Sequence, residues 1–298
     1  MIRYYLSVLL LFGFSCSNAV ASREKNHKKE KTEVIKCPSM GEFKPIADSI
    51  LAEGLRLYGH EKVAWMTSDS AGVHSKNLKD IGGYVVYEED DVFTSVFTDD
   101  KEENVVFCGK GKLDELRNGL QWSNEVRPLS DEEKSALKTK KTCLEKLSKA
   151  YGDSIYNHPS AKGTLNIDII KRKNGYRLYI LQGTTLMGIL PYGNDYIVDY
   201  DNDFNITSFK RCHKGYLGIS VDSKEIVSST HSHTPDNPYM TVTDVCTSLL
   251  YGRDLYGIKT FNVLSTHFKN GFFIWFDTDR LEINGMDMNV LKKIYGKE

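Results

Sequence analysis

Hydrophobic and polar residues recur along most of this chain with the periods of regular secondary structure. Between residues 45 and 59, four aliphatic residues follow helical spacing, and Gly59 is a typical helix end: Ile46, Ile50, Leu51 and Leu55. Residues 82–111 contain three runs rich in β-branched and aromatic residues, which the acidic turns 88–91 and 99–103 separate. The pattern predicts a helix over 45–59 and then three antiparallel strands.

A second helix is predicted after residue 130. Ser130 and Glu133 form a capping-box signature, and Gly152 supplies a stop. Between them, apolar residues lie near one helix face: Leu137, Leu144, Leu147 and Tyr151. We expect this helix to end a small N-terminal α+β domain over residues 41–153.

From residue 164 onward the pattern changes to short strands. Hairpins are predicted about Asn174-Gly175, Asn202-Asp203 and Asn270-Gly271, since such pairs favour tight turns. Two short strands precede residue 233, and residues 241–254 have the pattern of a helix. Strands before and after a helix predict a second α+β domain with a mixed sheet over residues 154–298.

The first residues have the composition of an export signal. Arg3 precedes a short apolar run over 6–14, and Ala19-Val20-Ala21 matches a signal-peptidase site. Cys16 after Ser15 also resembles the acylation site of bacterial lipoproteins. We therefore expect a signal peptide over 1–21, lipidated at Cys16 or cleaved, and a polar tether over 22–40. The expected location is the periplasm or cell envelope, with a lipid anchor to the outer membrane as one alternative.

Composition and charge exclude several partners. The chain has 298 residues, of which 40% are hydrophobic and 27% charged, and its net charge is −1. Such a balance gives no long-range attraction for nucleic acid or for an anionic membrane surface. We expect no nucleic-acid partner, and membrane contact only through a lipid at Cys16.

The six cysteines do not form a recognisable framework. They are scattered without C-x-x-C spacing, so the chain is neither a disulfide scaffold nor a zinc ribbon. One or two disulfides fit an oxidising compartment. Cys143 and Cys246 lie in helical patterns and are expected in the core.

The strongest chemical signal is a pair of histidines near the end of a predicted strand. His231 and His233 are two residues apart, so their imidazoles point to the same face. Asp244 lies in the first turn of the helix that Thr241 begins. Two imidazoles and a carboxylate form a three-ligand site, with a position left open as in hydrolytic zinc enzymes. Alternatively, Thr241 and Asp244 form only a capping box, and the histidines are hydrogen-bonded surface residues.

This stretch resembles the JAMM (MPN+) metalloprotease motif, H-x-H-[PT]-x(6–7)-S-x-x-D. The matching residues are His231, His233, Thr234, Thr241 and Asp244. The resemblance covers about residues 160–280 and implies a JAMM-like fold, with zinc held by His231, His233 and Asp244. It also implies hydrolysis of amide bonds in a peptide or protein, and places Thr241 where the family has a catalytic serine.

The chain departs from that family at the expected proton acceptor. The family carries a glutamate on an earlier strand, but no glutamate lies between residues 154 and 224 here. Gln182 falls near the expected place, and an amide is not a base at neutral pH. Asp195 is the best carboxylate substitute, although a turn aspartate is the plainer interpretation. The segment 193–196, the two histidines and residues 243–251 are also similar to uncharacterised exported proteins of Bacteroidetes-type bacteria.

Two functions from different classes follow. One is an exported zinc-dependent amide hydrolase with Asp195 and Thr241 as catalytic residues. The other is a non-catalytic binding or structural protein of the envelope, a degenerate JAMM-like fold. His213 and His267 are weaker candidates for joining the site, since single strand histidines are usually structural.

Overall fold

The computed structural model describes residues 35–75, 81–221, 226 and 228–296. The predicted signal peptide, Cys16 and most of the predicted tether lie outside these residues. The last part of that tether contacts the folded chain: Ile35 forms a parallel β-bridge with Phe268, and the first helix begins at Met40. No helix in the described ranges is long and apolar enough to cross a membrane.

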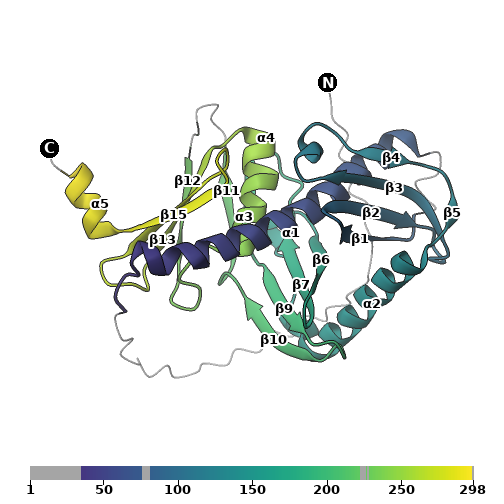
Figure 1. Cartoon of the computed structure of the whole chain (residues 1–298), viewed down its shortest axis with the longest axis horizontal. Coiled ribbons are helices and arrows are strands. Elements are labelled where there is room, and N and C mark those ends of the chain that lie inside the picture. The colour runs from purple at the N-terminus through teal and green to yellow at the C-terminus, as the bar shows by residue number, and fades with distance from the viewer. Residues whose placement is uncertain (1–34, 76–80, 222–225, 227, 297–298) are drawn as a thin grey trace.

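A single long helix, α1 (Met40–His74), crosses the whole molecule (Figure 1). Ser39 and Glu42 form a capping box at its start, which explains why the helix begins before the predicted residue 45. The predicted end at Gly59 is wrong, because the helix continues through this glycine. A Cβ there would lie 2.5 Å from the ring of Phe93, so Gly59 serves close packing against β2.

The first sheet contains the three predicted strands and two further short ones, and the second helix agrees with the prediction. The five-stranded antiparallel sheet runs in the order β1-β2-β3-β4, with β5 also paired to β3. Its strands are β1 (Gly83–Glu89), β2 (Val92–Thr98), β3 (Asn104–Lys112), β4 (Gln121–Ser123) and β5 (Arg127–Pro128). Helix α2 (Asp131–Tyr151) begins at the predicted capping box of Ser130 and Glu133.

The remaining strands form three smaller sheets. The first has the order β10-β9-β7-β6: β6 (Leu165–Arg172), β7 (Gly175–Gln182), β9 (Tyr196–Tyr200) and β10 (Ile206–Arg211). The second pairs β8 (Ile189–Gly193) with β11 (Tyr216–Ser220). The third has the order β12-β13-β14-β15: β12 (Ser228–His233), β13 (Thr260–Ser265), β14 (Phe272–Asp277) and β15 (Glu282–Asp287). All three predicted hairpins form, whereas β8 and β15 were not predicted.

The helix predicted over 241–254 is helical throughout but changes its period. It consists of α3 (Val242–Thr247), a π-helical turn over Ser248–Arg253 and α4 (Asp254–Tyr256). This helix connects β12 to β13, which pair in parallel as a β-α-β unit requires. Helix α5 (Met288–Tyr295) follows β15.

The largest core cluster joins α1 with the C-terminal half of the chain. Phe43, Ala47, Leu57 and Tyr58 of α1 are buried with residues of α3, β13 and β14. The same helix packs against β2 and β3 of the first sheet. The mixed α+β class is therefore confirmed, while a division of the chain after residue 153 stays a prediction, with α1 in contact with elements on both sides.

Candidate metal centre

Strand β12 places its two histidines side by side. Residues Ser229, His231 and His233 are buried and alternate with exposed neighbours, so both imidazoles leave the same face of the strand. Their Nε2 atoms are 3.0 Å apart. The strand is fixed by parallel pairing with β13, in which His231 lies opposite Val263 and His233 opposite Ser265.

Helix α3 brings Asp244 to the two histidines. Its carboxylate lies 3.3 Å from the Nε2 atoms of both His231 and His233. Thr241 caps this helix: the backbone N–H and the hydroxyl of Thr241 both donate to Oδ2 of Asp244. The other oxygen, Oδ1, is buried and accepts no hydrogen bond from any described residue. The two interpretations of Asp244 are thus compatible, because Oδ2 both caps the helix and lies near His233, while Oδ1 lies near His231.

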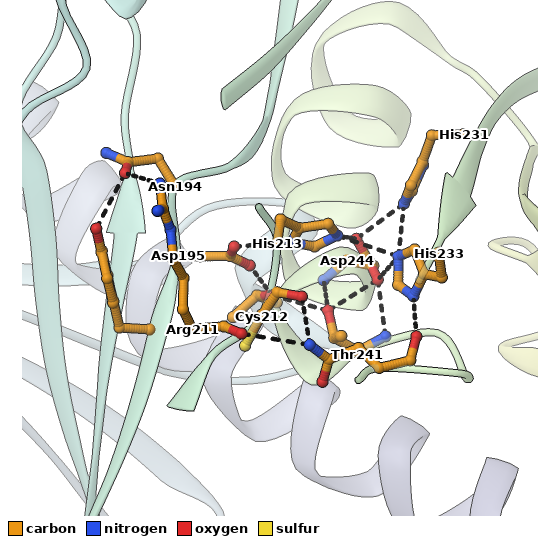
Figure 2. Close-up of polar contacts among 12 residues, drawn as sticks. Asn194, Asp195, Arg211, Cys212, His213, His231, His233, Thr241 and Asp244 are labelled. Carbon is orange, nitrogen blue, oxygen red and sulfur yellow. Dashed lines mark hydrogen bonds and ion pairs between the residues drawn. The ribbon is translucent and has the colours of Figure 1, made fainter. Parts of the chain in front are cut away.

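A third histidine completes the cluster. His213 lies in the connection between β10 and β11, and its Nε2 is 3.1 Å from Nε2 of His233 and 3.2 Å from Oδ1 of Asp244 (Figure 2). Ligand atoms of His213, His231, His233 and Asp244 all lie within 4.8 Å of one another, and we call these four residues the metal cluster. His267, the other weak candidate, is not among them and packs its ring against Phe268.

The turn before β9 positions His213. Gly193 and Asn194 both have positive φ, +77° and +54°, and a Cβ on Gly193 would lie 2.0 Å from the carbonyl oxygen of Gly215. Two backbone hydrogen bonds join this turn to the β10–β11 connection, from Asn194 N to Gly215 O and from Cys212 N to Asp195 O. Asp195 consequently faces His213 from behind, and its Oδ1 lies 2.7 Å from Nδ1 of the imidazole.

Both carboxylate oxygens of Asp195 accept hydrogen bonds. One accepts from His213, and the other accepts from the hydroxyl of Thr243. Its side chain is buried and lies behind an imidazole instead of facing the centre of the cluster. This geometry suits a residue that orients a metal-binding histidine. The role of proton acceptor predicted for Asp195 stays a prediction, and so does the catalytic role predicted for Thr241, whose hydroxyl contacts Asp244 and Thr243.

Outer hydrogen bonds define which ring nitrogens can bind an ion. Nδ1 of His233 lies 2.7 Å from the carbonyl oxygen of Tyr239 and 3.1 Å from that of Asn237. A carbonyl only accepts, so Nδ1 carries the proton and Nε2 of the neutral ring offers its lone pair to the cluster. The contact between His213 and Asp195 has the same consequence for His213.

The electrostatics of the metal cluster favour a cation at its centre. Burial disfavours a charged His213, but the negative charges of Asp195 and Asp244 outweigh it and raise its pKa well above the usual value. Burial would also raise the pKa of Asp244, whereas the imidazoles of His213, His233 and His231 hold it well below its usual range. Asp244 is therefore a carboxylate, and without a metal a proton on His213 balances part of its charge.

A bound metal ion explains the arrangement of the four residues better than hydrogen bonds among them do. The lone pair at Nε2 of His233 faces two other imidazole nitrogens and a carboxylate oxygen at 3.0–3.3 Å. One proton cannot serve all four atoms, but one ion can. A tetrahedral ion with ligands at about 2.0–2.1 Å has ligand–ligand edges of about 3.3–3.4 Å, close to these separations.

Burial is nearly complete around the metal cluster. The side chains of His231, His233 and Asp244 are 5%, 1% and 1% exposed, and that of His213 is 13% exposed. Any access to the cluster is therefore on the His213 side. Cys212, which precedes His213, is not among the grouped ligands, and burial and the charges of Asp195 and Asp244 raise the pKa of its thiol well above the usual value.

The remaining cysteines and Gln182 lie outside this chemistry. All five described cysteines are free thiols, and Cys143 and Cys246 are buried in the core as expected. The side-chain oxygen of Gln182 accepts from His158 N and from the side chain of Asn194. It therefore supports the turn that carries Asp195.

Comparison of this chain with protein-family models, with curated proteins and with solved structures finds no match.

Proposed function

We propose that this chain is a zinc-binding protein in which His213, His231, His233 and Asp244 hold one ion. The observation that carries the proposal is the convergence of three imidazole nitrogens and one unpaired carboxylate oxygen at a buried point. Imidazole and carboxylate ligands suit zinc, as they suit several other divalent ions, and the contacts of His233 with the other three residues, at 3.0–3.3 Å, are close to the edges of a tetrahedral site.

We infer that the ion has a structural or binding role and not a hydrolytic one. Hydrolytic zinc sites have three protein ligands and an open position, whereas four protein ligands converge here. The glutamate that accepts the proton in the JAMM family also has no counterpart among the residues at this site, since Asp195 contacts His213 and Thr243. An ion in this place would join three separate elements: β12, α3 and the β10–β11 connection.

Amide hydrolysis is the second candidate, and two observations favour it. The residues of the JAMM-like motif come together, and His213 is the most exposed of the four ligands. Zinc also accepts a fifth ligand in some catalytic sites. Under this candidate the substrate is a peptide or protein, and residues 154–298 are a JAMM-like domain. Export to the cell envelope is part of both proposals and rests on residues 1–21.

Metal analysis tests the proposal directly. Protein purified without a histidine tag and incubated with zinc should retain about one ion per chain after dialysis, measured by inductively coupled plasma mass spectrometry. Competition with manganese, iron(II), cobalt and nickel would establish whether zinc is the preferred ion. Retention of no stoichiometric metal would refute the site.

A peptide-library assay separates the two candidates. The zinc-loaded protein should cleave no peptide between about pH 5 and 9, the range in which a general base of this kind would operate. Cleavage that disappears on substitution of His231, while the variant remains folded, would instead establish the hydrolase.

A further inference from the structure

A second site lies away from the metal cluster, between α1, the loop after β7 and the π-helical turn. This cavity encloses about 220 Å³, and none of the four metal ligands lines it. Its walls include α1 with Glu61 and Trp65, strand β1 with Tyr84, residues 183–189, and the helix 251–256. Such a concave space with mixed apolar and polar walls is the usual form of a small-molecule site.

The wall chemistry points to a positively charged ligand. Aromatic side chains line much of the cavity, among them Trp65, Tyr84, Tyr251 and Tyr256. Two acidic residues, Glu61 and Asp69, also line it, and no Lys, Arg or His does so among the described residues. Aromatic faces and carboxylates together attract organic cations, and they offer nothing to an anion.

Glu61 is a buried carboxyl group on this wall. It is 6% exposed, and its Oε2 accepts a hydrogen bond of 2.8 Å from Asn166. Burial and the negative charge of Asp168 raise the pKa of Glu61 well above its usual value. No Lys, Arg or His of the described residues forms an ion pair with Glu61, so an ammonium group in the cavity would supply the cationic partner that this carboxyl group lacks.

The rim of the cavity offers an apolar surface to the rest of a ligand. Leu186 is 41% and Met187 70% exposed, yet their loop is fixed at both ends. The Thr184 hydroxyl donates to the carbonyl oxygen of Ala161, and Gly188 N donates to the Tyr256 hydroxyl. An ordered loop that holds large apolar side chains in solvent is typical of a contact surface.

The geometry points to a binding site for an alkylammonium ligand: a primary amine on a short apolar stem. We propose that the amine enters among the aromatic side chains and pairs with Glu61, while the stem lies against Leu186 and Met187. Two sources share this chemistry, a free aliphatic diamine and the side chain of a lysine in a peptide.

Calorimetric titration of the whole protein with 1,5-diaminopentane tests the proposal. Saturable binding at one site is expected at millimolar or lower concentration, with none for 1,5-pentanediol, which has the same stem and no charge. N-acetyl-lysine methylamide, compared with its neutral norleucine analogue, distinguishes the second source. Binding of either amine supports the site, and binding of neither amine, or equal binding of the neutral analogues, overturns it.

Substitutions in the cavity test whether the amine binds at Glu61. Glu61→Gln keeps the shape of the protonated acid and should weaken amine binding about tenfold or more, as expected for loss of a charged hydrogen-bond partner. Asp131→Asn is the matched control, since this side chain is 98% exposed on α2. Should Glu61→Gln fail to fold, Trp65→Leu, which removes an aromatic face of the same cavity, should weaken amine binding in its place. Unchanged affinity in a folded Glu61→Gln protein overturns the assignment.

Discussion

Two clusters of buried ionisable side chains in this protein differ in how their charges are balanced. In the metal cluster, three imidazoles surround one carboxylate, and no Lys or Arg of the described chain forms an ion pair there. The second, which we call the ionic cluster, consists of His60, Glu88, Lys140 and Asp168 between α1, β1, α2 and β6. It contains its own cations.

In the ionic cluster, His60 lies between two carboxylates, but neither of its ring nitrogens forms a hydrogen bond with a described residue. His60 lies 3.5 Å from Asp168 and 3.8 Å from Glu88, which also pairs with Arg56. Interaction with His60, and then with Arg56, lowers the pKa of Glu88 to about 2. Lys140 donates to the carbonyl oxygen of Tyr84 and lies over its ring.

The contrast between the two clusters provides a criterion that distinguishes a metal site from a buried ion network. Both are rich in histidine and carboxylate, so composition does not separate them. What separates them is the direction of the ring nitrogens. In the metal cluster, outer hydrogen bonds from Nδ1 of His213 and His233 leave Nε2 directed inward. In the ionic cluster, both ring nitrogens of His60 face carboxylates.

Removal of one ligand should have the largest effect on this contrast. We expect His233→Ala to lower zinc affinity by more than about 100-fold, since even outer-shell changes cost about 10–100-fold. Metal content after dialysis and the zinc-dependent rise in melting temperature measure the effect. His267→Ala is the control, because this ring lies outside the metal cluster. Equal loss of zinc in both variants would contradict the assignment.

Disruption of the ionic cluster should reduce stability and leave metal binding intact. Asp168→Asn removes the partner of His60, and breaking a buried ion pair costs about 3–5 kcal/mol. Urea unfolding measures this loss, with Asp131→Asn as an exposed control. The folded variant should still retain about one zinc ion per chain. Loss of the metal with no loss of stability would show that the two clusters have the opposite roles.

The carboxylate behind His213 should have a smaller effect. Asp195→Asn keeps the size of the side chain but removes the charge that orients the imidazole, and zinc affinity should fall about 10–100-fold. Direct competition with a chelator of known affinity gives the value. Asp199→Asn, on the neighbouring strand and paired with Arg177, is the matched control. Undiminished affinity in Asp195→Asn would leave Asp195 free for a different role.

The smallest expected effect is on the pH dependence of stability. The pKa of His213 is raised in the folded, metal-free protein, so this group stabilises the fold fully below its unfolded value of about 6.5. That stability is lost as the pH rises through the folded pKa, with a slope of at most about 1.4 kcal/mol per pH unit. Zinc affinity should rise over the same window, because the ion displaces the proton.

Thermal unfolding at a series of pH values measures both trends. His60 also has a raised pKa and contributes in the same direction, so His213→Gln is the necessary comparison. The wild-type slope in metal-free buffer should exceed that of His213→Gln. Identical slopes would mean that His213 carries no extra proton in the metal-free protein.

Local sequence rules predicted a large part of this molecule. Capping boxes, hairpin turns and alternating strands depend on neighbours a few residues apart, which is why α2, β1–β3 and the three hairpins form as expected. The predicted helix end at Gly59 was wrong. A glycine often ends a helix, but here it allows Phe93 of β2 to approach α1. The reason is a contact 34 residues away, and no local rule contains it.

The residues of the metal cluster likewise fall into two groups: those that local sequence patterns predicted and those that long-range packing added. The shared strand face of His231 and His233 and the place of Asp244 after a helix cap could be predicted from the sequence, because strand and helix periods fix those directions. That His213 joins them and that Asp195 lies behind it depends on long-range packing. Those contacts depend on how the turn at Gly193–Asn194 packs against the β10–β11 connection, and sheet packing brings together residues whose separation in sequence carries no periodic signal.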